Sequence, residues 1–282
     1  MDATSSQPVA GSVGSVPLWY HTLELPGGVV TPGMFDLRGH VDRLPWPDVR
    51  GKRCLDVATY DGFYAFELER RGAGQVVAID IPDHEDWDWP AGARARGGPG
   101  LAALAGEKGR GFEVAHAALG SNVEKHTVNV YDLSPAELGT FDVVVCGSLL
   151  LHLRDPVRAL EAMRSVCGGW LLSIEAISLW LSLLAPRRAV AELSRNDLAC
   201  QWWTVNVVGH RRLAEAAGFE VTDTTGPFAE PFGVSHPARR SRTPQALGLH
   251  AFRRAFAGGQ GVPHAALLAR PRPDVPLPAA RA

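Results

Sequence analysis

Short apolar runs alternate with amphipathic segments along most of the chain. Between residues 50 and 175, five apolar runs have the length of buried strands, and turn residues separate them. The strands we expect are 53–58, 75–80, 126–130, 141–147 and 170–175. The helices we expect between them are 62–71, about 112–119 and 156–166. Such alternation predicts a mostly parallel sheet with helices on both faces, which is a Rossmann-like α/β fold.

The pattern changes after the fifth strand. Residues 178–206 are longer than one crossover helix requires and contain Trp180, Trp202 and Trp203. We interpret this segment as an α-helical cap inserted over the carboxyl edge of the sheet. A helix at 207–218 then ends at a glycine, and 219–223 and 245–256 are expected to form two final strands, as a hairpin.

The two ends of the chain are expected to lie outside the main domain. Residues 1–16 are small and polar and predict a mobile tail, within an N-terminal tail and lid segment at 1–45. Residues 259–282 hold five prolines and predict a flexible C-terminal tail. The main domain is accordingly expected at 46–258.

Composition restricts the class of partner. The chain has 28 basic and 30 acidic residues, a net charge of -2, and 46% hydrophobic residues. This balance argues against a nucleic acid or a membrane surface as partner, and favours a small molecule. Four cysteines without a CxxC pair and an N-terminus without a secretory signal predict a cytoplasmic protein. We expect a monomer or a homodimer. His84, Glu85 and Asp86 adjoin one another but lack metal-ligand spacing, so we expect no metal.

Acidic residues end the first two strands, where doubly wound folds bind ligands. Asp56 precedes the turn Ala58-Thr59-Tyr60, and Asp80 comes 24 residues later. A carboxylate at the position of Asp80 can accept hydrogen bonds from ribose hydroxyls. The first turn lacks GxGxxG, so it suits a pyrophosphate poorly and a ligand with an amine and a sulfonium better.

Further polar residues follow the later strands. Asp132 is a candidate to accept a hydrogen bond from an adenine amino group, and a helix N-cap is the equal alternative. His152 lies in the loop after the fourth strand, and Glu175 ends the fifth. Both are candidate general bases, as is His21, because neutral imidazole is available near pH 7.

Three long runs resemble a known family. They are LDVATYDGFYAFELERRGAGQVVAID at 55–80, NVYDLSPAELGTFDVVVCGSLLLHLRDP at 129–156 and WYHTLELPGGVVTPG at 19–33. Together they resemble class I methyltransferases that depend on S-adenosylmethionine, and more narrowly the group related to bacterial wobble-uridine (carboxy)methyltransferases of tRNA. The resemblance spans roughly residues 18–257. It implies a seven-stranded sheet whose last strand is antiparallel.

The resemblance also implies a binding site for S-adenosylmethionine, which leaves as S-adenosylhomocysteine. The residues expected around the cofactor are Tyr20, Asp56, Ala58, Thr59, Tyr60, Gly62, Asp80, Ile81, Tyr131, Asp132, Gly147, Ser148 and Leu149. The candidate catalytic residues are His152, His21 and Glu175, and the substrate pocket is expected to include Trp180, Trp202, Trp203 and Asn206. Ala58 and Tyr60 stand where the family has glycines, so the sequence does not determine the backbone conformation of this turn.

Three functions compete on these data. The first is methylation of an oxygen or nitrogen of a small molecule in natural-product (antibiotic) biosynthesis, which the Trp-rich cap and neutral charge favour. The second is modification of uridine in tRNA, for which the main support is a basic patch formed by Ala238-Arg239-Arg240-Ser241-Arg242, with Arg253 and Arg254 beyond it. The third is binding of S-adenosylmethionine without catalysis.

Overall fold

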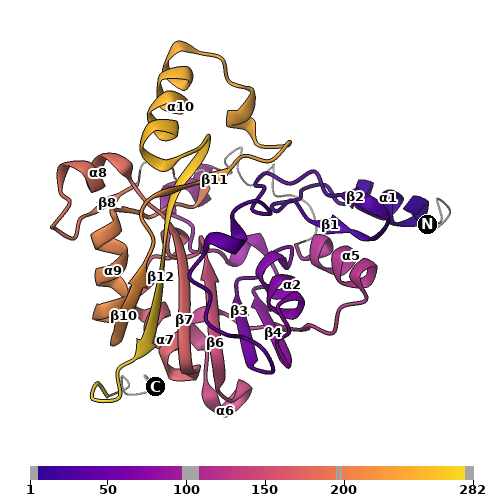
Figure 1. The fold of residues 1–282 in the computed structure, drawn as a ribbon, viewed down its shortest axis with the longest axis horizontal. Coiled ribbons are helices and arrows are strands. Elements are labelled where there is room, and N and C mark those ends of the chain that lie inside the picture. Colours follow the sequence, from indigo (N-terminus) through magenta and orange to yellow (C-terminus); the bar gives the residue numbers. More distant parts are fainter. Residues whose placement is uncertain (1–5, 97–107, 195, 197–198, 277–282) are drawn as a thin grey trace.

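The computed structural model describes residues 6–96, 108–194, 196 and 199–276 (Figure 1). Its main sheet has the strand order β10-β12-β7-β6-β3-β4-β5, and a further strand, β11, pairs with β12. The strands are β3 (Arg53–Val57), β4 (Gln75–Asp80), β5 (Glu124–Thr127), β6 (Phe141–Gly147), β7 (Cys167–Ala176), β10 (Phe219–Thr224), β11 (Phe228–Pro231) and β12 (Gly261–Pro271). Strands β3 to β7 are parallel, and β12 runs antiparallel to both of its neighbours, as the resemblance implied.

Side-chain alternation divides the core into two layers. On β3, Cys54 faces the layer formed with α1, α2 and α5, whereas Leu55 and Val57 face the layer formed with α7 and α9. The helices that cover the sheet are α2 (Phe63–Arg70), α5 (Arg110–Leu119), α7 (Pro156–Val166) and α9 (Val207–Ala216), and α1 (Ser6–Gly14) packs against α5. Shorter helices are α3 (Ala91–Arg96) and α6 (Pro135–Leu138). Burial on both faces explains why the central strands are continuously apolar.

The C-terminal part differs from the expectation in two places. Residues 245–256 form a helix, α10 (Pro244–Ala257), with Thr243 as its N-cap, and are not a strand. The strand that closes the sheet is β12, which lies within the segment predicted to be a flexible tail. Both predictions were wrong, because the alanines of β12 pack between β7 and β10 and are recognisable as core only once those strands are in place. Residues 277–282 lie outside the described part.

The cap is mixed in structure and not purely helical. It consists of α8 (Leu179–Leu184) and the antiparallel pair β8 (Ala191–Leu193) and β9 (Trp203–Val205), and α10 lies beside it (Figure 1). Asn206 joins β9 to α9 and is fully buried.

The N-terminal segment packs on the domain. Val13 and Val16 belong to the core, so the prediction of a mobile tail over 1–16 was wrong for its described residues. A small pair of strands, β1 (Glu24–Leu25) and β2 (Val29–Val30), follows α1. Phe35 then forms an isolated antiparallel β-bridge with Phe232, the residue after β11. The lid segment therefore contacts the end of β11. No helix in the described ranges has the length and apolarity to cross a membrane.

Candidate functional site

A cavity of about 970 Å³ opens at the carboxyl edge of the sheet. The turns after β3, β4 and β6 line one side, and β11, β12, α8 and α10 contribute to the other. This is the edge where open α/β sheets bind ligands. The volume lies at the upper end of the range of about 300–1,000 Å³ for ligand pockets. It therefore has room for a cofactor and an acceptor side by side.

Three residues lining the cavity have left-handed backbone. Ala58 has φ 59°, Tyr60 has φ 48° and Ser148 has φ 50°, and none of them is glycine. A non-glycine residue in this region costs on the order of 1–3 kcal/mol, and such strain gathers at functional sites. The turn after β3 thus keeps a path that favours glycine although its side chains have changed. This settles the backbone path that the sequence left open.

Gly147 leaves no room for a side chain. A Cβ at this position would lie 2.3 Å from the ring of Tyr64. The end of β6 is therefore held close against α2, and its backbone faces the cavity directly.

Two acids of the cofactor side are buried. The carboxylate of Asp56 accepts the backbone N–H of Ala65, and burial raises its pKa to about 7. Asp80 accepts N–H groups from Tyr60 and Ile81. The ammonium of Lys108 lies 2.5 Å from Asp80 Oδ1, so any ligand hydroxyl must share that carboxylate with the lysine.

Asp61 holds the lid segment over the cavity. Its Oδ2 accepts the backbone N–H groups of Tyr20 at 2.6 Å and His21 at 3.0 Å. Burial raises the pKa of Asp61 to about 7. Gly111 makes room for it, since a Cβ there would lie 2.4 Å from its carboxylate. Burial lowers the pKa of His21 to about 4, so this imidazole is neutral at pH 7.

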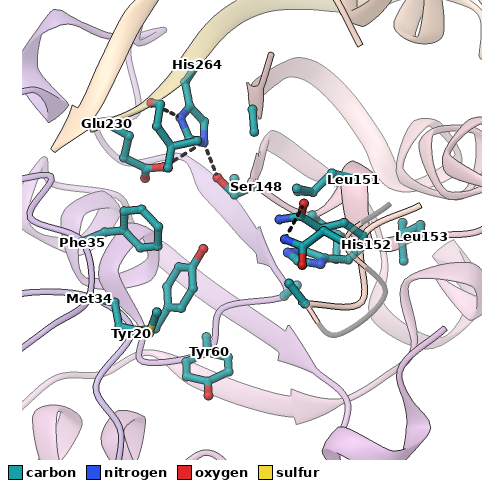
Figure 2. A pocket seen from close by; sticks show the side chains of 18 of the residues that line it. Tyr20, Met34, Phe35, Tyr60, Ser148, Leu151, His152, Leu153, Glu230 and His264 are labelled. Carbon is teal, nitrogen blue, oxygen red and sulfur yellow. Dashed lines mark hydrogen bonds and ion pairs between the residues drawn. The ribbon is translucent and has the colours of Figure 1, made fainter. Parts of the chain in front are cut away.

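A buried polar cluster lies on the opposite side of the cavity (Figure 2). Nε2 of His264 lies 2.7 Å from Glu230 Oε2 and 2.9 Å from the hydroxyl of Ser148. Nδ1 of His264 lies 2.9 Å from the carbonyl oxygen of Val262, so Nδ1 carries a hydrogen and donates it. Burial lowers the pKa of His264, but the charge of Glu230 and the hydrogen bonds outweigh it and raise the pKa above 6.5.

Besides His21, the sequence predicted His152 and Glu175 as general bases, and the structure places these two differently. His152 lines the cavity, Nδ1 lies 3.0 Å from the carbonyl oxygen of Cys200, and burial lowers its pKa. Glu175 is buried, and its oxygens accept the N–H groups of Leu150 and Ala176. Its carboxylate braces the loop after β6 and does not line the cavity. These contacts favour a positioning role for Glu175 in the loop after β6, and its catalytic role stays a prediction.

Of the four cap residues predicted in the substrate pocket, two line the cavity and two do not. Trp180 and Trp203 line the cavity. Trp202 does not line it, and its indole N–H donates to the carbonyl of Asp88. Asn206 caps α9 through the N–H of Gly209 and donates to cap carbonyls, so it holds the cap together and was wrongly predicted in the pocket.

The structure brings most of the predicted residues to this cavity. Those that line it are Tyr20, His21, Asp56, Ala58, Thr59, Tyr60, Asp80, Ile81, Tyr131, Gly147, Ser148, Leu149, His152, Trp180 and Trp203. Those that do not are Gly62, Asp132, Glu175, Trp202 and Asn206. Asp132 is exposed, and its contact with adenine stays a prediction.

The sequence did not single out Lys108, Glu230 or His264, and it grouped Arg253 only with a basic patch that could contact phosphate, although all four line the cavity. Glu230 and His264 lie in segments expected to be a loop and a tail, so no local pattern pointed to them. The side chains of Arg239 and Arg240, from the basic patch, lie outside the described residues. Within the described ranges, no group of three or more potential metal ligands occurs.

The charges of the cavity fit S-adenosylmethionine. Two described lysine or arginine side chains line it, Lys108 and Arg253. Five described carboxylates line it as well: Asp56, Asp80, Asp86, Asp88 and Glu230. An acidic site favours a ligand with an amine and a sulfonium. The donor set and the close backbone at Gly147 therefore match this cofactor.

The fold and its ligand edge define the class: this is a Rossmann-like methyltransferase fold. A family model described as "Methyltransferase domain" matches residues 36–224. The chain belongs to this family, that of the class I methyltransferases that depend on S-adenosylmethionine.

Curated relatives match only part of the chain. The ubiquinone biosynthesis O-methyltransferase of Neisseria meningitidis serogroup C is 32% identical over 119 residues, which are 41% of this chain and 39% of the relative. The enzyme of the same name from Thiobacillus denitrificans is 27% identical over 199 residues, which cover 65% of this chain and 73% of the relative. The match thus spans about two fifths of the first relative's length.

Solved structures agree on the fold. The [4+2]-cyclase SpnF has a TM-score of 0.51 at 18% identity, covering 94% of this chain and 92% of that one. A putative S-adenosylmethionine-dependent methyltransferase from Listeria monocytogenes has a TM-score of 0.50 at 12% identity, and the match covers 83% of this chain and 97% of that one. These findings do not support the narrower resemblance to the tRNA wobble-uridine group.

Proposed function

We propose that this protein transfers a methyl group from S-adenosylmethionine to a hydroxyl oxygen of a small molecule. The observation that carries the proposal is the buried cluster of Glu230, His264 and Ser148. It adjoins the strained turn after β6, and Glu230 and His264 come from β11 and β12, which contribute to the other side of the cavity from the turn after β3. A hydroxyl acceptor must lose a proton as it is methylated, and this cluster offers a place for that proton.

The chain's own residues would hold the cofactor on the acidic side. Asp80 would accept the ribose hydroxyls, the turn at 58–60 would surround the methionine part, and Gly147 and Ser148 would border the sulfonium. Tyr20 and His21 would cover it, since Asp61 holds their backbone over the cavity. When bound, S-adenosylmethionine supplies an electrophilic methyl carbon on a positive sulfur.

The neutral form of His264 would take the proton on Nε2. The new oxygen–carbon bond forms as the sulfur–carbon bond breaks, and the hydroxyl proton passes to the imidazole. Glu230 stabilises the resulting imidazolium from 2.7 Å, while Val262 fixes the ring through Nδ1. His21 and His152 are weaker acceptors because burial lowers the pKa of both.

The kind of acceptor follows from the walls of the cavity. Phe35, Phe232 and Trp203 line it, which suits an apolar or aromatic molecule. The relatives named for ubiquinone biosynthesis are O-methyltransferases, which supports oxygen as the acceptor atom. A role in natural-product biosynthesis is part of this proposal. So is the assignment of 1–45 as N-terminal tail and lid segment and of 178–206 as cap.

Methyl transfer can be tested directly. Pure protein is incubated with S-adenosylmethionine and, separately, with a panel of phenols and with total bacterial tRNA, and S-adenosylhomocysteine is quantified. We expect turnover with a phenol, a methoxy product by mass spectrometry, and its loss in His264→Asn. Turnover on tRNA alone, or tight cofactor binding without turnover on any phenol, would contradict the proposal.

A further inference from the structure

The cavity contains a cation that no described acid neutralises. Arg253 lies on α10, which packs against β11 and β12, and its side chain lines the cavity. These strands belong to the half of the sheet opposite β4, whose end carries Asp80. Arg253 therefore faces the acceptor side and not the proposed cofactor side.

The guanidinium of Arg253 is half-buried without compensation. Among the described residues it has no ion pair and no hydrogen bond, whereas Lys108, the other cation of the cavity, is paired with Asp80. Burial alone lowers the pKa of Arg253, and no acidic group acts against it. Removing charge from water is unfavourable unless the charge is paired, so this position is suited to an anion supplied from outside.

Aromatic rings surround this part of the cavity. The imidazole of His236 stacks on Phe232 with ring centroids 4.0 Å apart and meets Phe35 edge-on at 5.0 Å. Trp180 stacks on Phe252, the neighbour of Arg253, at 4.7 Å. All five side chains line the cavity. A flat apolar molecule fits between such walls, and its charged end is then directed to the cation.

We propose that Arg253 binds a carboxylate of the methyl acceptor, so that the substrate is a hydroxylated aromatic acid. This inference rests on the proposed function, because it assigns the acceptor's place within the same cavity. The carboxylate neutralises Arg253 while the aromatic part lies between Phe232, Phe252 and the turn after β6. That orientation directs the other end of the molecule toward Ser148 and His264.

Arg254 offers a matched control. It follows Arg253 on the same helix, carries the same charge, is exposed, and does not line the cavity. Any effect of general surface charge would appear equally in both positions. An effect of a specific contact appears only at Arg253.

The test compares two probes of nearly the same shape, one with a carboxylate and one with a neutral carboxamide. The affinities of 6-hydroxy-2-naphthoate and 6-hydroxy-2-naphthamide are measured by fluorescence titration in the presence of S-adenosylhomocysteine, for the wild type, Arg253→Met and Arg254→Met. We expect the wild type to prefer the carboxylate by roughly tenfold or more, as for a charge-assisted contact. Arg253→Met should abolish the preference, and Arg254→Met should keep it.

The results separate this inference from the proposed function. An equal preference in the wild type and Arg253→Met, an equal loss in both variants, or no binding of either probe overturns the carboxylate site. If S-adenosylhomocysteine fails to bind but the probes still distinguish Arg253, only the methyltransferase proposal fails. Turnover of the naphthoate, lost in His264→Asn, would support both.

Discussion

Nε2 of His264 lies 2.7 Å from Oε2 of Glu230 because of the register between β11 and β12. His264 pairs directly with Phe228, and Glu230 is two residues further along the same strand. Residues in this diagonal relation point to the same face of an antiparallel pair, here the face that lines the cavity. The proposed proton acceptor is thus built into the strand that closes the sheet.

Replacing His264 should affect chemistry and not cofactor binding. Asparagine cannot take the proton, so we expect His264→Asn to lower kcat by about 10²–10⁴-fold, the usual contribution of general base catalysis. Calorimetric titration with S-adenosylhomocysteine should give an unchanged Kd. His116→Asn, on α5 away from the cavity, is the control and should keep full activity. A large loss of cofactor affinity in His264→Asn would argue against the assigned role.

The pH profile should report the Glu230–His264 pair. Only neutral His264 accepts a proton, so kcat/KM should rise with pH through a midpoint above the ordinary value of 6.5. Glu230→Gln removes the charge that raises this pKa, while burial still lowers it. The midpoint should therefore move to lower pH, and kcat should fall because the imidazolium is less stabilised. An unchanged midpoint in the variant would remove His264 as the titrating group.

Asp80 and Asp132 should differ in their effect on cofactor affinity. We expect Asp80→Asn to weaken binding of S-adenosylhomocysteine by roughly tenfold or more, because a charged hydrogen-bond acceptor is lost. Asp132→Asn should change the Kd less than about twofold, as expected for an exposed surface position. Both constants come from calorimetry. Equal losses in the two variants would support Asp132 as a cofactor contact.

Glycine at position 58 should relieve strain. Alanine with positive φ is disfavoured by about 1–2 kcal/mol, so Ala58→Gly should leave stability unchanged or raise it by up to about 1 kcal/mol. The control Ala251→Gly lies in an exposed part of α10 and should lower stability by about 0.5–1 kcal/mol. Urea unfolding measures both. A comparable destabilisation by Ala58→Gly would contradict the left-handed conformation.

Asp61 should make stability depend on pH. Its folded pKa is about 7, above the ordinary value of 3.8, so the folded state binds the extra proton between these limits. The stabilising contribution of Asp61 to the free energy of unfolding is complete below about pH 4 and is lost as pH rises through 7. Asp61→Asn lacks this dependence, so the wild type should be more stable relative to the variant at pH 5 than at pH 8, by about 1 kcal/mol or more. Urea unfolding at both values tests this, and a constant difference would refute it.

Local patterns in the sequence determined the parallel half of the protein. The runs at 53–58, 75–80 and 141–147 are apolar because both faces of these strands are covered, and the acids that follow them reach one edge. The cofactor side of the cavity follows from these strands alone. The positions of Asp56, Asp80, Gly147 and Ser148 at this edge are therefore determined by local sequence.

Tertiary structure alone decided the acceptor side. β12 consists largely of small residues between prolines, and its neighbours β7 and β10 make it a strand, so it could not be distinguished from a tail. Glu230, Arg253 and His264 are far from Ser148 in the sequence, and they line the same cavity only because of the register of β11 and β12 and the packing of α10. Chemistry that depends on such long-range contacts has no local pattern in the chain.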